Sequence, residues 1–121
     1  MIKHKDITII SEGGVALAAR LFAPENPKAA VQINGGTAVK KEYYAAFARF
    51  LAENGFVSVI FDYRGCGGSK PADLAECDYS FLDYGVKDMP AVLDYLEAHY
   101  PDLPKLVVGH SVGGQQIGFY V

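Results

Sequence analysis

Alternating and nearly continuous apolar runs divide the first half of the chain into strands. Ile7–Ile10 and Val15–Phe22 flank the turn-forming segment 11–14, which predicts an antiparallel hairpin. Ala29–Ile33 is a short apolar run that predicts a third strand. Phe56–Phe61 is almost entirely apolar and rich in β-branched residues, as expected of a strand buried on both faces.

A different period, typical of amphipathic helices, occupies two further segments. Lys41–Glu53 carries apolar residues three and four positions apart, and Asn54-Gly55 is its predicted stop. Asp83–His99 predicts a second helix, in which Pro90 requires either a late start or a kink. The expected buried stripes are Tyr44, Phe47, Ala48 and Leu51 in the first helix, and Val86, Met89, Val92, Leu93 and Leu96 in the second.

The order of these elements predicts an α/β fold. After the hairpin, strands and helices alternate as far as Leu106–Val108 and the apolar-periodic segment that follows it. Such alternation is typical of a parallel sheet with helices on both faces. With no repeat and no internal boundary, residues 1–121 are expected to form one domain.

Composition excludes several classes of partner. The net charge of −3 argues against nucleic acid and against an anionic membrane surface, and no apolar stretch approaches the length of a membrane span. Since the N-terminus lacks the apolar core of a signal peptide, we expect a cytoplasmic protein. Cys66 and Cys77 match no zinc or redox spacing and are expected to remain thiols.

The strongest chemical signal is G-x-S-x-G in residues 109–113, directly after the apolar run Leu106–Val108. This pattern predicts a nucleophile elbow, a turn so tight that glycine is needed two residues on either side of the serine. Such a turn would lift the Ser111 hydroxyl above the sheet edge and point the amides of the next helix toward it. The alternative interpretation is an ordinary glycine-rich turn between strand and helix.

Two further glycine-rich segments follow predicted strands. Asn34-Gly35-Gly36-Thr37 could bring a backbone amide close to a substrate oxygen, and the sequence leaves Gly36 and Thr37 open as the donor. Residues 62–69, D-Y-R-G-C-G-G-S, fail the dinucleotide pattern because Lys70 and Pro71 stand where a glycine and a helix are required. Their predicted role is structural, with Asp62 and Arg64 holding the strand end.

The chain offers no credible general base and no metal site. Its three histidines are His4 near the N-terminus, His99 at a predicted helix end, and His110, which is adjacent to the serine that it would have to serve. No cluster of histidine, cysteine or carboxylate residues has metal-ligand spacing, so neither a metal nor a cofactor is expected.

Together the three motifs resemble the N-terminal part of the α/β-hydrolase superfamily, in its serine aminopeptidase, lysophospholipase and esterase branch. The resemblance implies strand order 1-2-4-3-5, Ser111 as nucleophile, and the backbone amides of Val112 and Gly36 as oxyanion hole. Asn34 stands where many members have histidine. The acid and histidine of the family's triad follow the serine in the chain, and this sequence contains neither.

The resemblance therefore implies acyl transfer from an ester, thioester or amide carbonyl of a small-molecule substrate to water, through an acyl-enzyme on Ser111. Because the base and acid are missing, we expect these 121 residues to hydrolyse activated esters far more slowly than a complete relative does. The alternatives are an inactive fragment and a non-enzymatic binding module with a vestigial elbow. The apolar strand Leu106–Val108 is also expected to leave an exposed sheet edge through which the chain self-associates.

Overall fold

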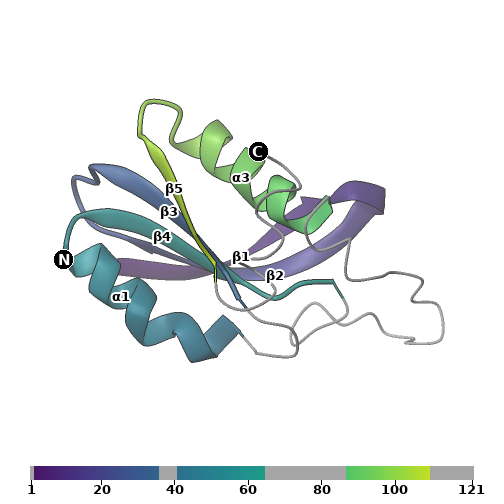
Figure 1. The fold of residues 1–121 in the computed structure, drawn as a ribbon, viewed down its shortest axis with the longest axis horizontal. Helices are drawn as coiled ribbons and strands as arrows, with labels where there is room; N and C mark the ends of the chain where they lie inside the picture. The colour runs from purple at the N-terminus through teal and green to yellow at the C-terminus, as the bar shows by residue number, and fades with distance from the viewer. Residues whose placement is uncertain (1, 36–40, 65–86, 110–121) are drawn as a thin grey trace.

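The computed structural model describes residues 2–35, 41–64 and 87–109, which form a five-stranded sheet with a helix on each face (Figure 1). The strand order is β1-β2-β4-β3-β5, as the resemblance implies. The strands are β1 (Lys3–Ser11), β2 (Val15–Ala23), β3 (Ala29–Asn34), β4 (Phe56–Phe61) and β5 (Lys105–Gly109). The helical segments are η1 (Glu12–Gly14), η2 (Lys41–Tyr44), α1 (Ala45–Glu53) and α3 (Met89–His99).

The predicted hairpin is confirmed and is longer than expected. β1 and β2 pair in antiparallel fashion from Lys3 opposite Ala23 to Ser11 opposite Val15. The turn between them places Gly13 and Gly14 at φ of 82° and 77°, in the left-handed region that glycine adopts without a steric penalty. β2 continues antiparallel to β4, and β3 lies parallel to both β4 and β5.

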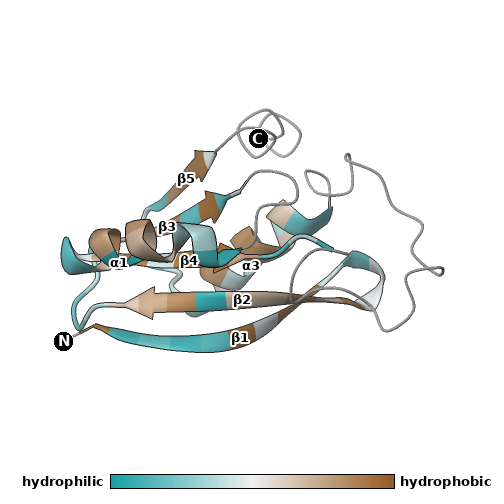
Figure 2. Ribbon diagram, turned by 90° about the horizontal axis from the view of Figure 1, so that it is seen from below, coloured by the Kyte–Doolittle hydropathy of each residue, from teal (hydrophilic) through white to brown (hydrophobic). Residues whose placement is uncertain are grey.

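Two apolar clusters lie on opposite faces of the sheet, as alternation along the strands requires. One contains the buried side of α3, and the other contains the buried side of α1. Figure 2 shows the N-terminal half of β1 as hydrophilic, which fits its position at the sheet edge. The α3 cluster includes Leu17, Ala19, Val57, Val59, Met89, Val92 and Leu96; the α1 cluster includes Phe22, Val31, Ile33, Tyr44, Ala48 and Ile60.

The first predicted helix differs from expectation in its start and its buried face. Lys41–Tyr44 is a 3₁₀ turn, and the α-helix begins only at Ala45. The buried apolar positions are Tyr44, Ala48 and Ala52, whereas Phe47 is 41% exposed. Because the small side chains of Ala48 and Ala52 contact the sheet, the helix lies close to it, and the bulkier Phe47 lies to one side.

The second predicted helix is confirmed from Met89 onward. α3 begins at Met89, so Pro90 lies in its first turn, where a missing amide hydrogen breaks no helical bond. It ends at His99, and the Tyr100 amide donates to the Leu96 carbonyl oxygen. The predicted start at Asp83 lies outside the described residues. None of the helices that the structure describes is long and apolar enough to cross a membrane.

Candidate active site at the carboxyl ends of three strands

The strands that carry the three motifs end at one edge of the sheet. β3 runs parallel to β4 and β5, so their carboxyl ends meet where ligands bind in open α/β sheets. Asn34 lies directly opposite Gly109 in the β3–β5 register. The segments leading to the N-G-G and G-x-S-x-G motifs therefore leave the sheet from adjacent positions. Ser111, Val112, Gly36 and Thr37 themselves lie outside the described residues.

The end of β4 is held by a buried ion pair between Asp62 and Lys41. Asp62 is 1% exposed and accepts from the Lys41 amide at 2.8 Å and from its Nζ at 3.2 Å. Nζ also donates to Glu42 at 2.7 Å. Burial alone would lower the pKa of the Lys41 ammonium, but the bond to Glu42 and the attraction of Asp62 outweigh it and raise the pKa. Lys41 therefore carries its charge throughout the neutral range.

Two residues further on, Arg64 joins three elements through a second buried network. Its amide and Nε each donate to an oxygen of Asp88 at 2.8 Å, and its Nη2 donates to Ser11 Oγ at 3.0 Å. Ser11 in turn donates to Asp88 at 2.9 Å. All three side chains are buried. The predicted role of Asp62 and Arg64 in holding the strand end is thus confirmed, and the chain leaving β4 is anchored to α3 and to the hairpin turn.

Polar side chains also fix the end of β3. Gln32 and Asn34 are fully buried, and Gln32 Nε2 donates to Asn34 Oδ1 at 2.8 Å and to the carbonyl oxygen of Met89 at 3.0 Å. The Tyr63 hydroxyl donates to the carbonyl oxygen of Gly35 at 2.8 Å. The start of the N-G-G segment therefore has fixed contacts to α3 and to the residues after β4.

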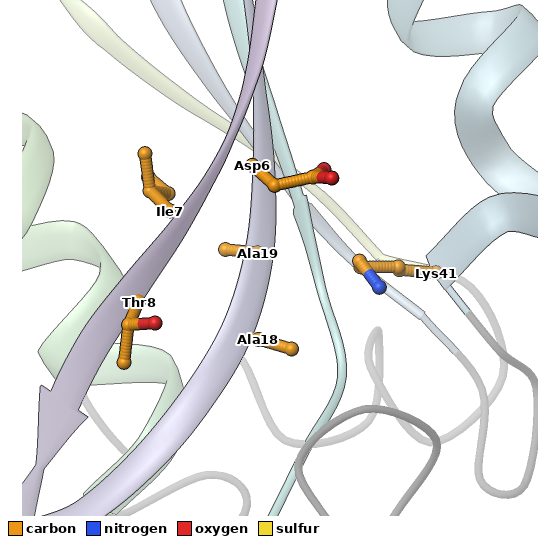
Figure 3. Close-up of a pocket in the computed structure, with 6 residues that line it drawn as sticks. All are labelled: Asp6, Ile7, Thr8, Ala18, Ala19 and Lys41. Carbon is orange, nitrogen blue, oxygen red and sulfur yellow. The ribbon is translucent and has the colours of Figure 1, made fainter.

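A hollow of about 300 Å³ lies between the hairpin and the start of η2 (Figure 3). Its walls are short side chains of β1 and β2, and the charged groups of Asp6 and Lys41 extend into it from opposite sides. Asp6 also pairs with Arg20 at 2.7 Å, and this hydrogen bond lowers the pKa of the Asp6 carboxyl group. Both charged groups that line the hollow thus already have partners among the described residues.

No metal site is evident in the part of the chain that the structure describes. Those residues contain no group of three potential metal ligands. His99 stacks on Tyr95 with ring centroids 4.0 Å apart, and its Nδ1 lies 2.9 Å from the Tyr95 carbonyl oxygen. His4 lies beside Phe22 on the edge strand, with ring centroids 5.9 Å apart. Both histidines in the described part of the chain thus lie against aromatic rings. Cys66 and Cys77 lie outside the described residues.

Sequence reasoning missed several residues that support this edge, among them Ser11, Tyr63 and Asp88. Asp88 occupies the position before α3 where an acidic side chain ordinarily caps a helix, yet it makes no cap and binds Arg64 instead. Asp88 lies inside the predicted helix Asp83–His99, and nothing in the local pattern singles it out. Ser11 belongs to a predicted turn, and Tyr63 to the D-Y-R-G motif, without a predicted role of its own.

The comparisons with known proteins agree with this architecture. The family model for serine aminopeptidase, S33, matches residues 25–119. The chain is 31% identical over 102 residues to an uncharacterised Pseudomonas aeruginosa protein, covering 78% of this chain and 26% of that protein. It is 27% identical over 115 residues to human monoglyceride lipase, covering 93% of this chain and 37% of the lipase.

Solved esterases share the fold. A thermostable carboxyl esterase from Bacillus coagulans superimposes with a TM-score of 0.82 at 24% identity, over 97% of this chain and 39% of that protein. An esterase of Pyrococcus furiosus superimposes with a TM-score of 0.78 at 22% identity, over 95% of this chain and 45% of the esterase. The chain thus spans between about a quarter and a half of the length of these relatives. Since the family model covers most of the sequence and all three motifs, the chain belongs to the serine aminopeptidase S33 family of α/β-hydrolases.

Proposed function

We propose that this chain supplies the nucleophile and the oxyanion hole of a serine hydrolase that acts on carboxylic esters. Ser111 is the nucleophile, and the backbone amides of Val112 and Gly36 bind the oxyanion. The observation that carries the proposal is the β3–β5 register, in which Asn34 opposite Gly109 starts the two motifs side by side. Relatives named as monoglyceride lipase and carboxyl esterase favour an ester over an amide or thioester.

The reaction follows from the chemistry of the motif residues. The Ser111 hydroxyl oxygen attacks the ester carbonyl carbon and gives its proton to a base, while the carbonyl oxygen becomes an oxyanion bound by the two amides. Collapse expels the alcohol, which takes a proton, and leaves an acyl group on Ser111. Water then adds to the acyl carbon, and the carboxylic acid leaves as the serine regains its proton.

The base is a histidine that follows the nucleophile in the chain order of this fold. No histidine follows Ser111 in these 121 residues. With the oxyanion hole alone, catalysis of about 10³–10⁴-fold over water remains. The 121-residue chain should therefore acylate slowly. With an activated ester whose leaving group needs no proton, deacylation should be slower still, because it requires a base to activate water, and the acyl-enzyme should accumulate.

That accumulation provides the test. The chain is incubated with 4-nitrophenyl acetate and digested, and the position of any acetyl group is determined by tandem mass spectrometry. We expect acetylation on Ser111, its loss in Ser111→Ala, and its retention in Ser80→Ala, which removes a serine outside the three motifs. Acetylation that is unchanged in Ser111→Ala, or that never reaches Ser111, would show that the proposal is wrong.

A further inference from the structure

We propose that the amino-terminal end of the sheet carries a second binding site, which takes a small organic ammonium ion. The site is a hollow of about 370 Å³ between the segment before β3 and the segment before β5. Because β3 and β5 run parallel and both begin at this end, the hollow lies at the opposite end of the sheet from the candidate active site (Figure 1). Its volume is near the lower end of the range of small-molecule pockets, which favours a small free molecule as the ligand. Binding here does not depend on Ser111 or on the proposed function.

The two walls of the hollow are joined and stiffened by the backbone. The Ala30 amide donates to the Pro104 carbonyl oxygen at 2.9 Å, which ties the start of β3 to the segment before β5. Pro27 lines one wall and Pro101 the other, and the ring of each proline fixes its own φ. Leu103 adds further apolar surface. Since the walls are already ordered, filling the hollow costs little conformational entropy.

The charge of the lining favours a cation. Glu25 belongs to one wall and Asp102 to the other, and the described lining contains no lysine or arginine. Lys105 follows the second wall, but its ammonium group donates to the Tyr100 carbonyl oxygen and lies 3.6 Å from Glu97. The hollow also lies at the carboxyl end of α3, where the helix dipole places partial negative charge. An ammonium group on a short apolar body therefore matches both the charge and the apolar surface of the lining.

His99 supplies a hydrogen-bond acceptor to this lining. Its Nδ1 lies 2.9 Å from the Tyr95 carbonyl oxygen, and since that oxygen can only accept, Nδ1 carries the proton. Nε2 of the neutral ring is then an acceptor, and no other residue in the described part of the chain binds it. Stacking on Tyr95 holds the plane of the ring. A metal ion is a poorer match than an ammonium N–H, because the described residues contain no group of three potential metal ligands.

The test compares benzylammonium chloride with benzyl alcohol, an uncharged molecule of nearly the same shape. Each is titrated into the isotope-labelled chain at mildly alkaline pH, and the shifts of the backbone amide signals are followed by NMR. We expect saturable shifts at residues 99–103 with benzylammonium, at an affinity of about millimolar for so small a ligand. Benzyl alcohol should bind about tenfold more weakly, because it lacks the charge that the carboxylates attract. Equal affinities, or shifts spread over acidic residues outside the hollow, would overturn the proposal.

Variants then assign the binding to named groups. His99→Phe keeps an aromatic ring beside Tyr95 and removes Nε2, while Asp102→Asn removes one charge; each should raise the Kd for benzylammonium by about fivefold or more. His4→Phe, at the other described histidine, is the matched control and should leave the Kd unchanged within about twofold. Urea titration shows which variants are folded. If a folded His99→Phe or Asp102→Asn chain binds as the wild type does, the proposal is wrong. The comparison of the two ligands uses the wild-type chain, so it decides the question even where a variant does not fold.

Discussion

β4 and β5 both end at the candidate site, yet they are held in different ways. β4 lies between β2 and β3, five of its six residues are buried, and the residues after it form two buried ion pairs. β5 pairs with β3 alone among the described strands, and its Leu106 and Val108 are 48% and 37% exposed. The frame of the site is thus fixed by side-chain networks around β4. The strand that leads to Ser111 is held by one backbone ladder and, at its first residue, by Lys105, whose Nζ donates to the Tyr100 carbonyl oxygen and lies 3.6 Å from Glu97.

The largest loss of stability is expected from a substitution that breaks the network of Arg64, Asp88 and Ser11 at the end of β4. Asp88→Ala leaves the Arg64 guanidinium buried without its carboxylate, and removing one partner of a buried ion pair destabilises a protein by about 3–5 kcal/mol. Asp94→Ala, at an exposed position of the same helix, should change the free energy of unfolding by less than about 0.5 kcal/mol. Urea titration measures both, and equal effects would show that the network does not stabilise this edge.

A smaller loss is expected from crowding the end of β3. Gly35→Ala sets a methyl group 2.6 Å from the Tyr44 ring, and overpacking of this kind costs about 1–3 kcal/mol. The cost should shrink in a Tyr44→Ala background, where the colliding ring is absent. Additive effects of the two substitutions would contradict the packing seen between Gly35 and Tyr44.

Substitutions in β5 should change the self-association of the chain more than its stability. An apolar strand with one unpaired edge is a template for strand addition, so we expect the chain to self-associate through β5. Replacing Leu106 and Val108 together by lysine should shift sedimentation toward the monomer. Ile10→Lys, on the opposite edge strand and 64% exposed, should leave association unchanged. A wild-type chain that is monomeric at every concentration, or equal effects of both changes, would contradict this prediction.

The smallest effect concerns pH. The hydrogen bond from Lys41 lowers the pKa of the Glu42 carboxyl group below its ordinary value of 4.5. A carboxylate whose pKa is lowered by folding contributes stability above its ordinary pKa and loses it as the pH falls through the lowered one. Since Glu42 is about half exposed, this contribution should be below about 1 kcal/mol. Glu42→Gln should flatten the acid side of the profile of unfolding free energy against pH, and a profile that this substitution leaves unchanged would contradict the prediction.

The local hydrophobic pattern predicted the helices and strands, but it could not predict which residues distant in the sequence contact one another. Alternation and helical spacing identified the hairpin, the strands and both helices, because those periods follow from backbone geometry. The same reasoning placed Phe47 in the core, since it could not show that Ala48 and Ala52 lie against the sheet. It linked Asp62 and Arg64 to the strand end but could not name their partners. Arg64 and Asp88 are 24 residues apart, and only tertiary packing brings them together.

For the candidate site too, the sequence predicted the local motif but not the contacts between distant residues. The glycine spacing around Ser111 carries the backbone requirement of an elbow, so it can be read from sequence. The hydrogen bond from Tyr63 to Gly35 cannot, because it depends on the ends of two neighbouring strands lying at the same level. Ser111, Val112 and Gly36 remain predictions, since they lie outside the described residues.

The most direct test of the central claim compares Ser111 with the other serines of the chain in the folded and unfolded states. An alkyl fluorophosphonate is added to the native chain and to the chain in urea, and the labelled positions are quantified by mass spectrometry. The account predicts that Ser111 in the native chain reacts faster than Ser11, Ser58, Ser69 and Ser80, and that urea abolishes the preference. Equal labelling of the serines in the native state, or a preference that survives unfolding, would contradict it.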